Sequence, residues 1–215
     1  GLIAGRCYLI GGPAGAGKTI FSLQWLRAGL QHHEKCLYIT LCEPGPEIIR
    51  NVASFDWRLE HIEIVDLSPS GSELGDESGE YHIFPPSEVE STPIWKSIYQ
   101  AVRRARPDRL VIDSVTQLRY LATDEHQFRK HILALVNFLN GTGTTSLLAF
   151  DPSEMARDTS VALAVDGVIR LSKDISAGLG IGLRSLEVEK LRGSGFMSGR
   201  HPMRITSNGM HVFPH

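Results

Sequence analysis

The stretch Arg6–Thr19, with the sequence RCYLIGGPAGAGKT, combines the features that decide the fold. A short apolar run is followed by a glycine-rich turn, and the turn ends in Lys18 and Thr19. Residues 12–19 match the pattern G-x-x-x-x-G-K-[ST], which forms a phosphate-binding loop when it lies between a strand and a helix. The apolar run predicts that strand, and apolar residues three and four apart over positions 20–30 predict the helix.

The chemistry of this loop follows from its backbone. Glycines allow successive backbone N–H groups to converge on a phosphate, and the helix that follows adds the positive end of its dipole. Lys18 is expected to contact the β- and γ-phosphates, and the Thr19 hydroxyl is expected to bind magnesium. The sequence therefore predicts a site for a nucleoside triphosphate with Mg²⁺. The residues expected to hold it form one continuous run: Gly12, Pro13, Ala14, Gly15, Ala16, Gly17, Lys18, Thr19 and Ile20.

Strands and helices are predicted to alternate along most of the chain. Short apolar runs predict strands at 36–41, 62–67, 109–113 and 144–150, and helical spacing predicts helices at 47–55, 94–105 and 128–139, the last ended by Gly141. Parallel strands need a connection long enough to cross back over the sheet. We therefore expect an α/β fold with a mostly parallel central sheet flanked by helices on both faces.

The C-terminal third has a different pattern. Strands are predicted at 165–171 and 183–191 around the glycine-rich residues 177–180, and at 204–206 and 211–213 around a turn at 207–209. We expect an antiparallel appendage there. Residues 68–92 hold six carboxylates and no Lys or Arg, and they predict an acidic, flexible loop.

Length and charge exclude several classes of protein. One domain spanning 1–215 is the default for 215 residues, and the first residue, Gly rather than Met, suggests a fragment of a longer, two-domain polypeptide. Acidic residues outnumber basic ones by 24 to 22, so the basic excess of a dedicated nucleic-acid-binding protein is missing.

Three scattered cysteines fit a reducing compartment, and the apolar runs are too short for a membrane span or a signal peptide. We expect a cytoplasmic protein.

Two carboxylates are candidates for the chemistry. Asp113 closes the buried run Leu110-Val111-Ile112, which places it at the carboxyl edge of a central strand, where it can hold the magnesium shell. Taken alone, an Asp in that place is more often a helix cap or a turn residue. Glu43 follows the second strand at the same edge and is the best available base for activating water, although a Glu before Pro-Gly-Pro is ordinarily a solvated loop residue.

Three separated stretches resemble the KaiC-like branch of the RecA superfamily of ATPases. They are residues 9–19, residues 109–116 and the run Glu189–Ser194, EKLRGS. The first stretch is shared by many nucleotide-hydrolysing proteins, whereas the Lys-Leu-Arg-Gly run after a late strand is specific. The resemblance covers nearly the whole chain. It implies a RecA-like P-loop fold that binds and hydrolyses ATP, in a signalling or regulatory role with protein partners.

The resemblance also implies an assembly. In this family the subunits form a ring, usually a hexamer, with ATP at each interface, and Lys190 and Arg192 correspond to cations that reach the γ-phosphate of the neighbouring subunit. The period of two along a strand supports that role, because it points both side chains to one side and Leu191 to the other. Without the resemblance, the simpler interpretation is that Lys190 and Arg192 are solvated basic residues that balance the negative charges of Glu187 and Glu189.

One residue departs from the family pattern. The family has two consecutive Glu residues after the second strand, and here the pair is Cys42-Glu43. A thiol is a poor replacement, because a thiolate beside bound phosphates is electrostatically disfavoured. If the missing Glu is the principal group that activates water, hydrolysis is slow.

Two other functions stay open. One is a RecA- or RadA-like recombination ATPase that assembles on single-stranded DNA, which needs basic or aromatic loops toward the ring centre. The candidate loop 172–183 offers only Lys173 against Asp174. The other is an ATP-gated assembly module without hydrolysis, which the missing carboxylate permits. The histidines show no metal-binding spacing, so magnesium is the only metal expected.

Overall fold

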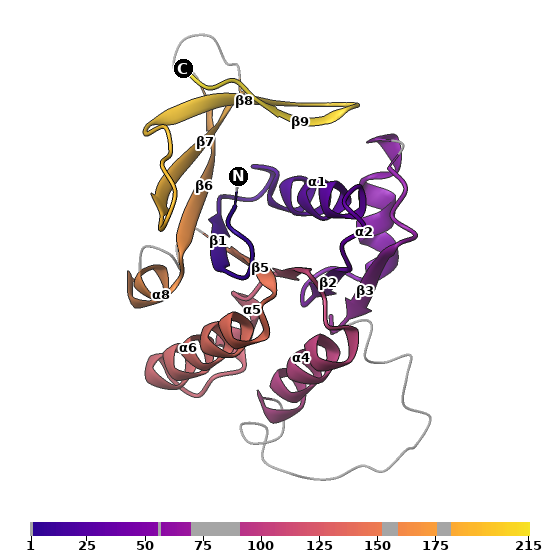
Figure 1. Cartoon of the computed structure of the whole chain (residues 1–215), viewed down its shortest axis with the longest axis vertical. Coiled ribbons are helices and arrows are strands. Elements are labelled where there is room, and N and C mark those ends of the chain that lie inside the picture. Colours follow the sequence, from indigo (N-terminus) through magenta and orange to yellow (C-terminus); the bar gives the residue numbers. More distant parts are fainter. Residues whose placement is uncertain (1, 56, 70–90, 152–158, 176–181) are drawn as a thin grey trace.

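The computed structural model describes residues 2–55, 57–69, 91–151, 159–175 and 182–215. Nine strands of this described part form one sheet in the order β3-β2-β4-β5-β1-β6-β7-β8-β9 (Figure 1). The strands from β3 to β6 run parallel, and β7, β8 and β9 continue the sheet in antiparallel order. The expected α/β fold, with a mostly parallel sheet and antiparallel C-terminal strands, is confirmed.

The strands lie close to their predicted positions. The parallel strands are β1 Cys7–Gly11, β2 Cys36–Thr40, β3 Ile62–Asp66, β4 Arg109–Asp113, β5 Thr145–Phe150 and β6 Gly167–Ile175, and the others are β7 Gly182–Leu191, β8 Arg200–Thr206 and β9 Gly209–Val212. The expected antiparallel appendage is confirmed for β7, β8 and β9, but its first predicted strand, β6, also pairs with β1 in parallel. The C-terminal strands therefore extend the main sheet. The predicted turn at 177–180 lies outside the described residues.

The helices cross between these strands. They are α1 Lys18–Leu30, α2 Gly45–Asn51, the 3₁₀ turn η1 Ala53–Phe55, α4 Ser91–Ala105, α5 Gln117–Tyr120, α6 Glu125–Thr142 and α8 Thr159–Ala164. The prediction that Gly141 ends α6 is wrong, because the helix continues to Thr142 and Gly143 takes the left-handed conformation beyond it, with φ +74°. Helices α5 and α8 are too short to show a helical period in the sequence. Most of the predicted acidic loop, residues 70–90, lies outside the described residues.

Side chains of the central strands alternate between two apolar cores. The core on the side of α4, α5 and α6 takes residues such as Leu9 of β1 and Leu148 of β5. The core on the side of α1 takes their neighbours Ile10 and Leu147. Figure 1 shows these two sets of helices on opposite sides of the sheet. Both faces of the parallel sheet are therefore covered, as the burial of its strands requires.

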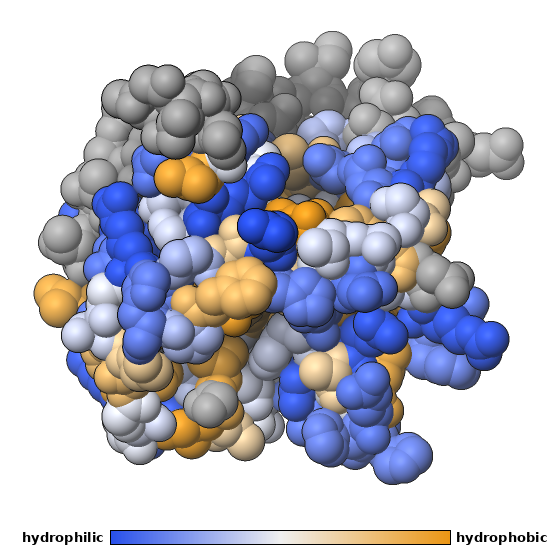
Figure 2. Space-filling model, turned by 90° about the horizontal axis from the view of Figure 1, so that it is seen from above, coloured by the Kyte–Doolittle hydropathy of each residue, from blue (hydrophilic) through white to orange (hydrophobic). Residues whose placement is uncertain are grey.

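The surface of the protein carries both hydrophilic and apolar residues. The face seen in Figure 2 is mostly hydrophilic, with small groups of apolar residues scattered over it. The large apolar side chains that are most exposed come from several elements: Ile49, Tyr120, Leu163, Leu183, Phe196, Met197 and Phe213. None of the helices in the described ranges is both long and apolar enough to cross a membrane.

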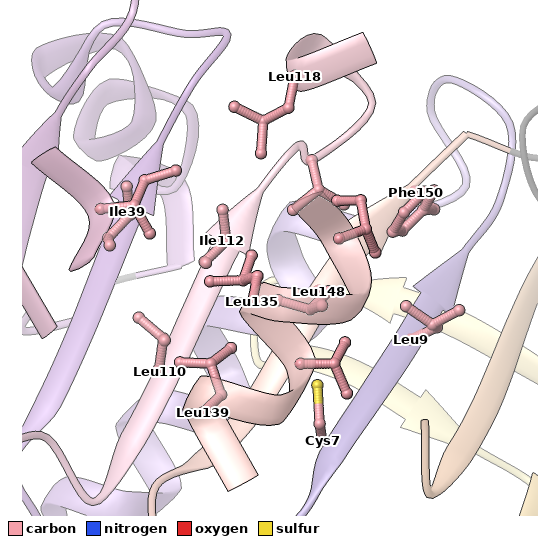
Figure 3. Close-up of a cluster of buried hydrophobic side chains, with 14 of the residues drawn as sticks. Cys7, Leu9, Ile39, Leu110, Ile112, Leu118, Leu135, Leu139, Leu148 and Phe150 are labelled. Carbon is pink, nitrogen blue, oxygen red and sulfur yellow. The ribbon is translucent and has the colours of Figure 1, made fainter. Parts of the chain in front are cut away.

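The core under α6 provides a test of the fold. Leu135 and Leu139 of α6 pack among strand residues such as Leu110 and Leu148, and all four are fully buried (Figure 3). Leu135→Ala should lower the free energy of unfolding by about 2–5 kcal/mol, because it leaves a cavity in a packed core. Chemical denaturation measures this value. Leu183→Ala, at a side chain that is 56% exposed, is the matched control with an expected change within about 0.5 kcal/mol. Equal losses in both variants would contradict this packing.

Candidate nucleotide-binding and hydrolysis site

The carboxyl ends of the central strands surround a pocket of about 640 Å³. Its walls are the loop between β1 and α1, the segments after β2, β4 and β5, and parts of α2 and β8. Open parallel sheets bind ligands at this edge. The predicted site residues that line the pocket are Pro13, Ala14, Gly15, Gly17, Lys18, Thr19, Ile20, Glu43 and Asp113.

The phosphate-binding loop has a backbone that requires glycine. Gly15 and Gly17 have φ values of +73° and +108°, which side chains other than glycine rarely tolerate. Gly12 and Ala16 are buried behind the loop and shape it without lining the pocket. A Cβ atom at Gly12 would lie 2.7 Å from the carbonyl oxygen of Leu171 in β6, so this strand packs directly against the loop.

Lys18 brings a largely buried positive charge to the pocket. Its side chain is 13% exposed, and its Nζ donates to the carbonyl oxygen of Gly12 and lies 3.3 Å from Oδ1 of Asp151. The loop therefore holds an ammonium group with a single carboxylate partner. A triphosphate would offer this ammonium stronger acceptors than a backbone carbonyl does.

Asp113, the last residue of β4, accepts hydrogen bonds from two hydroxyl groups. The Thr19 hydroxyl donates to its Oδ2 at 3.0 Å, and the Tyr38 hydroxyl donates to the same atom at 2.6 Å. Burial and the Asp113 carboxylate raise the pKa of Tyr38 well above its usual value, so the phenol keeps its proton and remains a donor. Asp113 and Thr19 thus meet at the carboxyl edge, where the sequence predicts them.

The donor set suits magnesium. Mg²⁺ prefers oxygen ligands and usually keeps several waters, binding through one or two protein groups together with substrate phosphates. Asp113 and Thr19 provide a carboxylate and a hydroxyl 3.0 Å apart at the mouth of the loop. The described residues contain no group of three His, Cys, Asp or Glu side chains that could hold a metal without a ligand. This arrangement fits a metal that binds with the nucleotide.

Glu43 and Cys42 follow β2 on the far wall of the pocket. The Glu43 side chain is exposed, and its Oε2 accepts a hydrogen bond of 3.2 Å from Asn51. Burial, followed by the nearby carboxylates of Asp113, Glu43 and Asp151, raises the pKa of the Cys42 thiol. The thiol therefore stays protonated near neutral pH and cannot take the place of a carboxylate in accepting a proton.

Lys190 and Arg192 converge on the end of a short helix. The Lys190 ammonium donates to the carbonyl oxygens of Ala162, Leu163 and Val165 at 2.6–3.0 Å, and Arg192 donates to that of Leu163 at 3.0 Å. Both side chains reach the same carbonyl oxygen, so they lie on the same side, as the period of two predicts. Neither residue lines the pocket.

These two cations lie level with the first half of β1, and not at its carboxyl end, where the phosphate-binding loop begins. Lys190 pairs with Val168, which pairs with Leu9, whereas the loop follows Gly11 at the end of β1. The two cations contact helix α8, which lies at the left of Figure 1. Helix α2, which borders the pocket, lies at the right. The predicted site residues thus form two separate groups within one chain.

The acidic residues near these cations have other partners. Glu189 pairs with Arg170, and Glu187 lies 3.6 Å from Arg200. The alternative prediction, in which Glu187 and Glu189 neutralise Lys190 and Arg192, is therefore wrong. Burial and the neighbouring Arg192 lower the pKa of Lys190.

The pocket also contains residues that the sequence analysis missed. Tyr38 lies inside β2 and reads only as part of an apolar run, so nothing marked it as a partner of Asp113. Arg184, whose Nε lies 3.3 Å from the carbonyl oxygen of Gly15, belongs to β7, which is distant in the sequence. Asp151 could have been found from the sequence, because it directly follows the predicted strand 144–150, just as Asp113 ends its own strand.

Comparison with known proteins identifies the family. A family model described as "ATPase: KaiC" matches residues 1–215. The chain belongs to the KaiC family of ATPases. It is 36% identical over 96% of its length to a UPF0273 protein of Methanopyrus kandleri and 35% identical to one of Thermotoga maritima, which it covers to 82% and 86%. It is 30% identical over its whole length to the circadian clock oscillator protein KaiC of Synechococcus elongatus, of which it covers 41%.

Cys42 provides a chemical test of the pocket. Because its pKa is raised, less thiolate is present at pH 7.5 than in an ordinary cysteine, and alkylation by iodoacetamide should be slow there and accelerate as the pH rises. The other cysteines, Cys7 and Cys36, are buried and should stay unmodified. Mg-ATP should protect Cys42. Peptide mass spectrometry over time measures this reaction. Alkylation at pH 7.5 as fast as that of free cysteine, with no protection by Mg-ATP, would contradict the site geometry.

Proposed function

We propose that this chain binds Mg-ATP in the pocket and hydrolyses it, with Lys190 and Arg192 of a neighbouring copy completing each site in a homo-oligomeric ring, a hexamer as the family resemblance implies. The observation that carries the proposal is the separation of the two groups of site residues. The pocket has a phosphate-binding loop and a magnesium-type oxygen pair, while Lys190 and Arg192 lie outside it, level with the first half of β1.

Binding rests on positive charge held by rigid elements. Backbone N–H groups of the loop after Pro13 and the N-terminus of α1 surround the phosphates, and Lys18 moves from Asp151 to the β- and γ-phosphate oxygens. Thr19 and Asp113 hold the magnesium ion. When bound, this ion neutralises phosphate charge and orients the terminal phosphate.

Hydrolysis needs a positioned water and neutralisation of the charge that develops in the transition state. Glu43 lies in the pocket with its carboxylate held by Asn51, where it can orient a water. A cation supplied by a neighbouring subunit raises phosphoryl-transfer rates by about 10³–10⁵ in proteins that use one. Turnover should then depend on assembly, because an isolated chain lacks that cation.

The place of Cys42 favours slow turnover. The thiol stays protonated beside three carboxylates, so the first Glu of the family pattern has no chemical equivalent at this position. The same observation supports the second candidate function, an ATP-gated assembly module in which the nucleotide stabilises the ring without hydrolysis. Because relatives of this chain include circadian clock oscillator proteins, a signalling or regulatory role with protein partners is the natural use of a slow ATPase.

Mixing two inactive variants tests the shared site. Lys18→Ala removes the nucleotide site and keeps the cations, whereas Arg192→Ala keeps the nucleotide site and removes a cation. Each variant alone should release phosphate at least tenfold more slowly than the wild type. Their mixture should recover activity after subunit exchange. In a mixed ring, the nucleotide site of an Arg192→Ala subunit can lie beside the intact cations of a Lys18→Ala subunit. Phosphate release measures the rate.

Controls separate this result from general damage. Arg104→Ala removes an equally basic side chain that is 68% exposed and pairs with Glu63, and it should leave the rate unchanged. The wild-type rate per subunit should fall on dilution. A proven monomer with a concentration-independent rate, or a mixture no more active than its components, would rule out the shared site. Stable rings that bind ATP without releasing phosphate would favour the assembly module.

A further inference from the structure

Asp151 is a third carboxylate in the pocket. It is the first residue after β5, and β5 lies between β1, which carries the phosphate-binding loop, and β4, which carries Asp113. Neighbouring strands lie about 4.8 Å apart, so the end of β5 is one strand spacing from β1, whereas the end of β2, which precedes Glu43, is about 14 Å away. Asp151 is therefore the carboxylate nearest to Lys18 and to a phosphate bound there.

The contacts of Asp151 fix its backbone and leave one oxygen available. Its backbone N–H donates to the Thr116 hydroxyl at 3.0 Å, and its Oδ1 lies 3.3 Å from the Lys18 ammonium. Among the described residues, its Oδ2 has no hydrogen-bond partner. The side chain is 45% exposed toward the pocket, so water reaches it.

The negative charge of Asp151 is unfavourable for binding a triphosphate, so its presence in the pocket needs a chemical explanation. Once Lys18 turns to the phosphates, a carboxylate beside it repels a triphosphate, and an asparagine in this place would accept the same hydrogen bond without that repulsion. A carboxylate has one property that an amide lacks, since it can accept a proton. Because Cys42 stays protonated, the pocket otherwise has Glu43 alone for this task.

We infer that Asp151 is a catalytic carboxylate of this site, replacing the one absent at position 42, and that it accepts the proton of the attacking water. This inference rests on the proposed function. The water oxygen forms a bond to the γ-phosphorus while the bond from that phosphorus to the bridging oxygen breaks, and the electron pair leaves on ADP. One water proton passes to Asp151 and then to solvent, and the other stays on the released phosphate.

The substitution Asp151→Asn tests the role of the charge with the smallest change of shape. It should lower kcat by about 100-fold, the lower range for loss of a general base. Affinity for a non-hydrolysable ATP analogue should stay equal or become tighter, because Lys18 loses its competing carboxylate. Asp174→Asn is the matched control, since that side chain is 63% exposed in an ion pair with Arg200, and its kcat should equal that of the wild type.

A second substitution distinguishes proton transfer from a structural role. Cys42→Glu should raise the turnover of the wild type, and in the Asp151→Asn background it should restore kcat at least tenfold. A kcat of Asp151→Asn within twofold of the wild type would overturn the inference, and so would a loss that Cys42→Glu leaves unchanged. If the wild type itself binds the analogue and releases no phosphate, the proposed hydrolysis fails and this inference fails with it. If the wild type is active, only the role of Asp151 is under test.

Discussion

The whole site depends on keeping the ammonium group of Lys18 largely buried at the end of β1. Its side chain is 13% exposed, and its ammonium contacts the carbonyl oxygens of Gly12 and Pro13 and the carboxylate of Asp151. The surrounding structure serves this arrangement. Positive-φ glycines shape the loop, β6 packs against Gly12, and the sheet order places the carboxyl ends of β5 and β4 beside the charge. A phosphate chain is the ligand that such a combination of amides and cation attracts best.

Local sequence predicts those parts of the site whose position follows from one motif or one strand. The loop at 12–19 is contiguous, and Asp113 is placed by the strand that it ends, so both could be found without the structure. Tyr38 and Arg184 could not, because their approach to the pocket depends on which strands become neighbours. The same reason explains β6, whose sequence shows a hairpin but not its parallel pairing with β1.

The positive side chains among the predicted site residues lie in two separate places in the chain. The pocket contains three carboxylates together with Lys18 and Arg184, whereas Lys190 and Arg192 are held against backbone carbonyl groups near α8. One chain therefore carries the pocket residues and, apart from them, the two cations that we propose to act in the site of a neighbouring subunit. Cys42 stands where the family pattern has Glu, and Asp151 at the end of β5 is the carboxylate that we infer accepts the proton instead.

Calorimetric titration of Mg-ATP into the folded protein tests the central claim most directly, with Lys18→Ala as the comparison. The account predicts one nucleotide bound per chain, and at least tenfold weaker binding, a loss of about 1.4 kcal/mol or more, when the ammonium is removed. Absence of nucleotide binding by correctly folded wild-type protein, or equal binding by the variant, would contradict it.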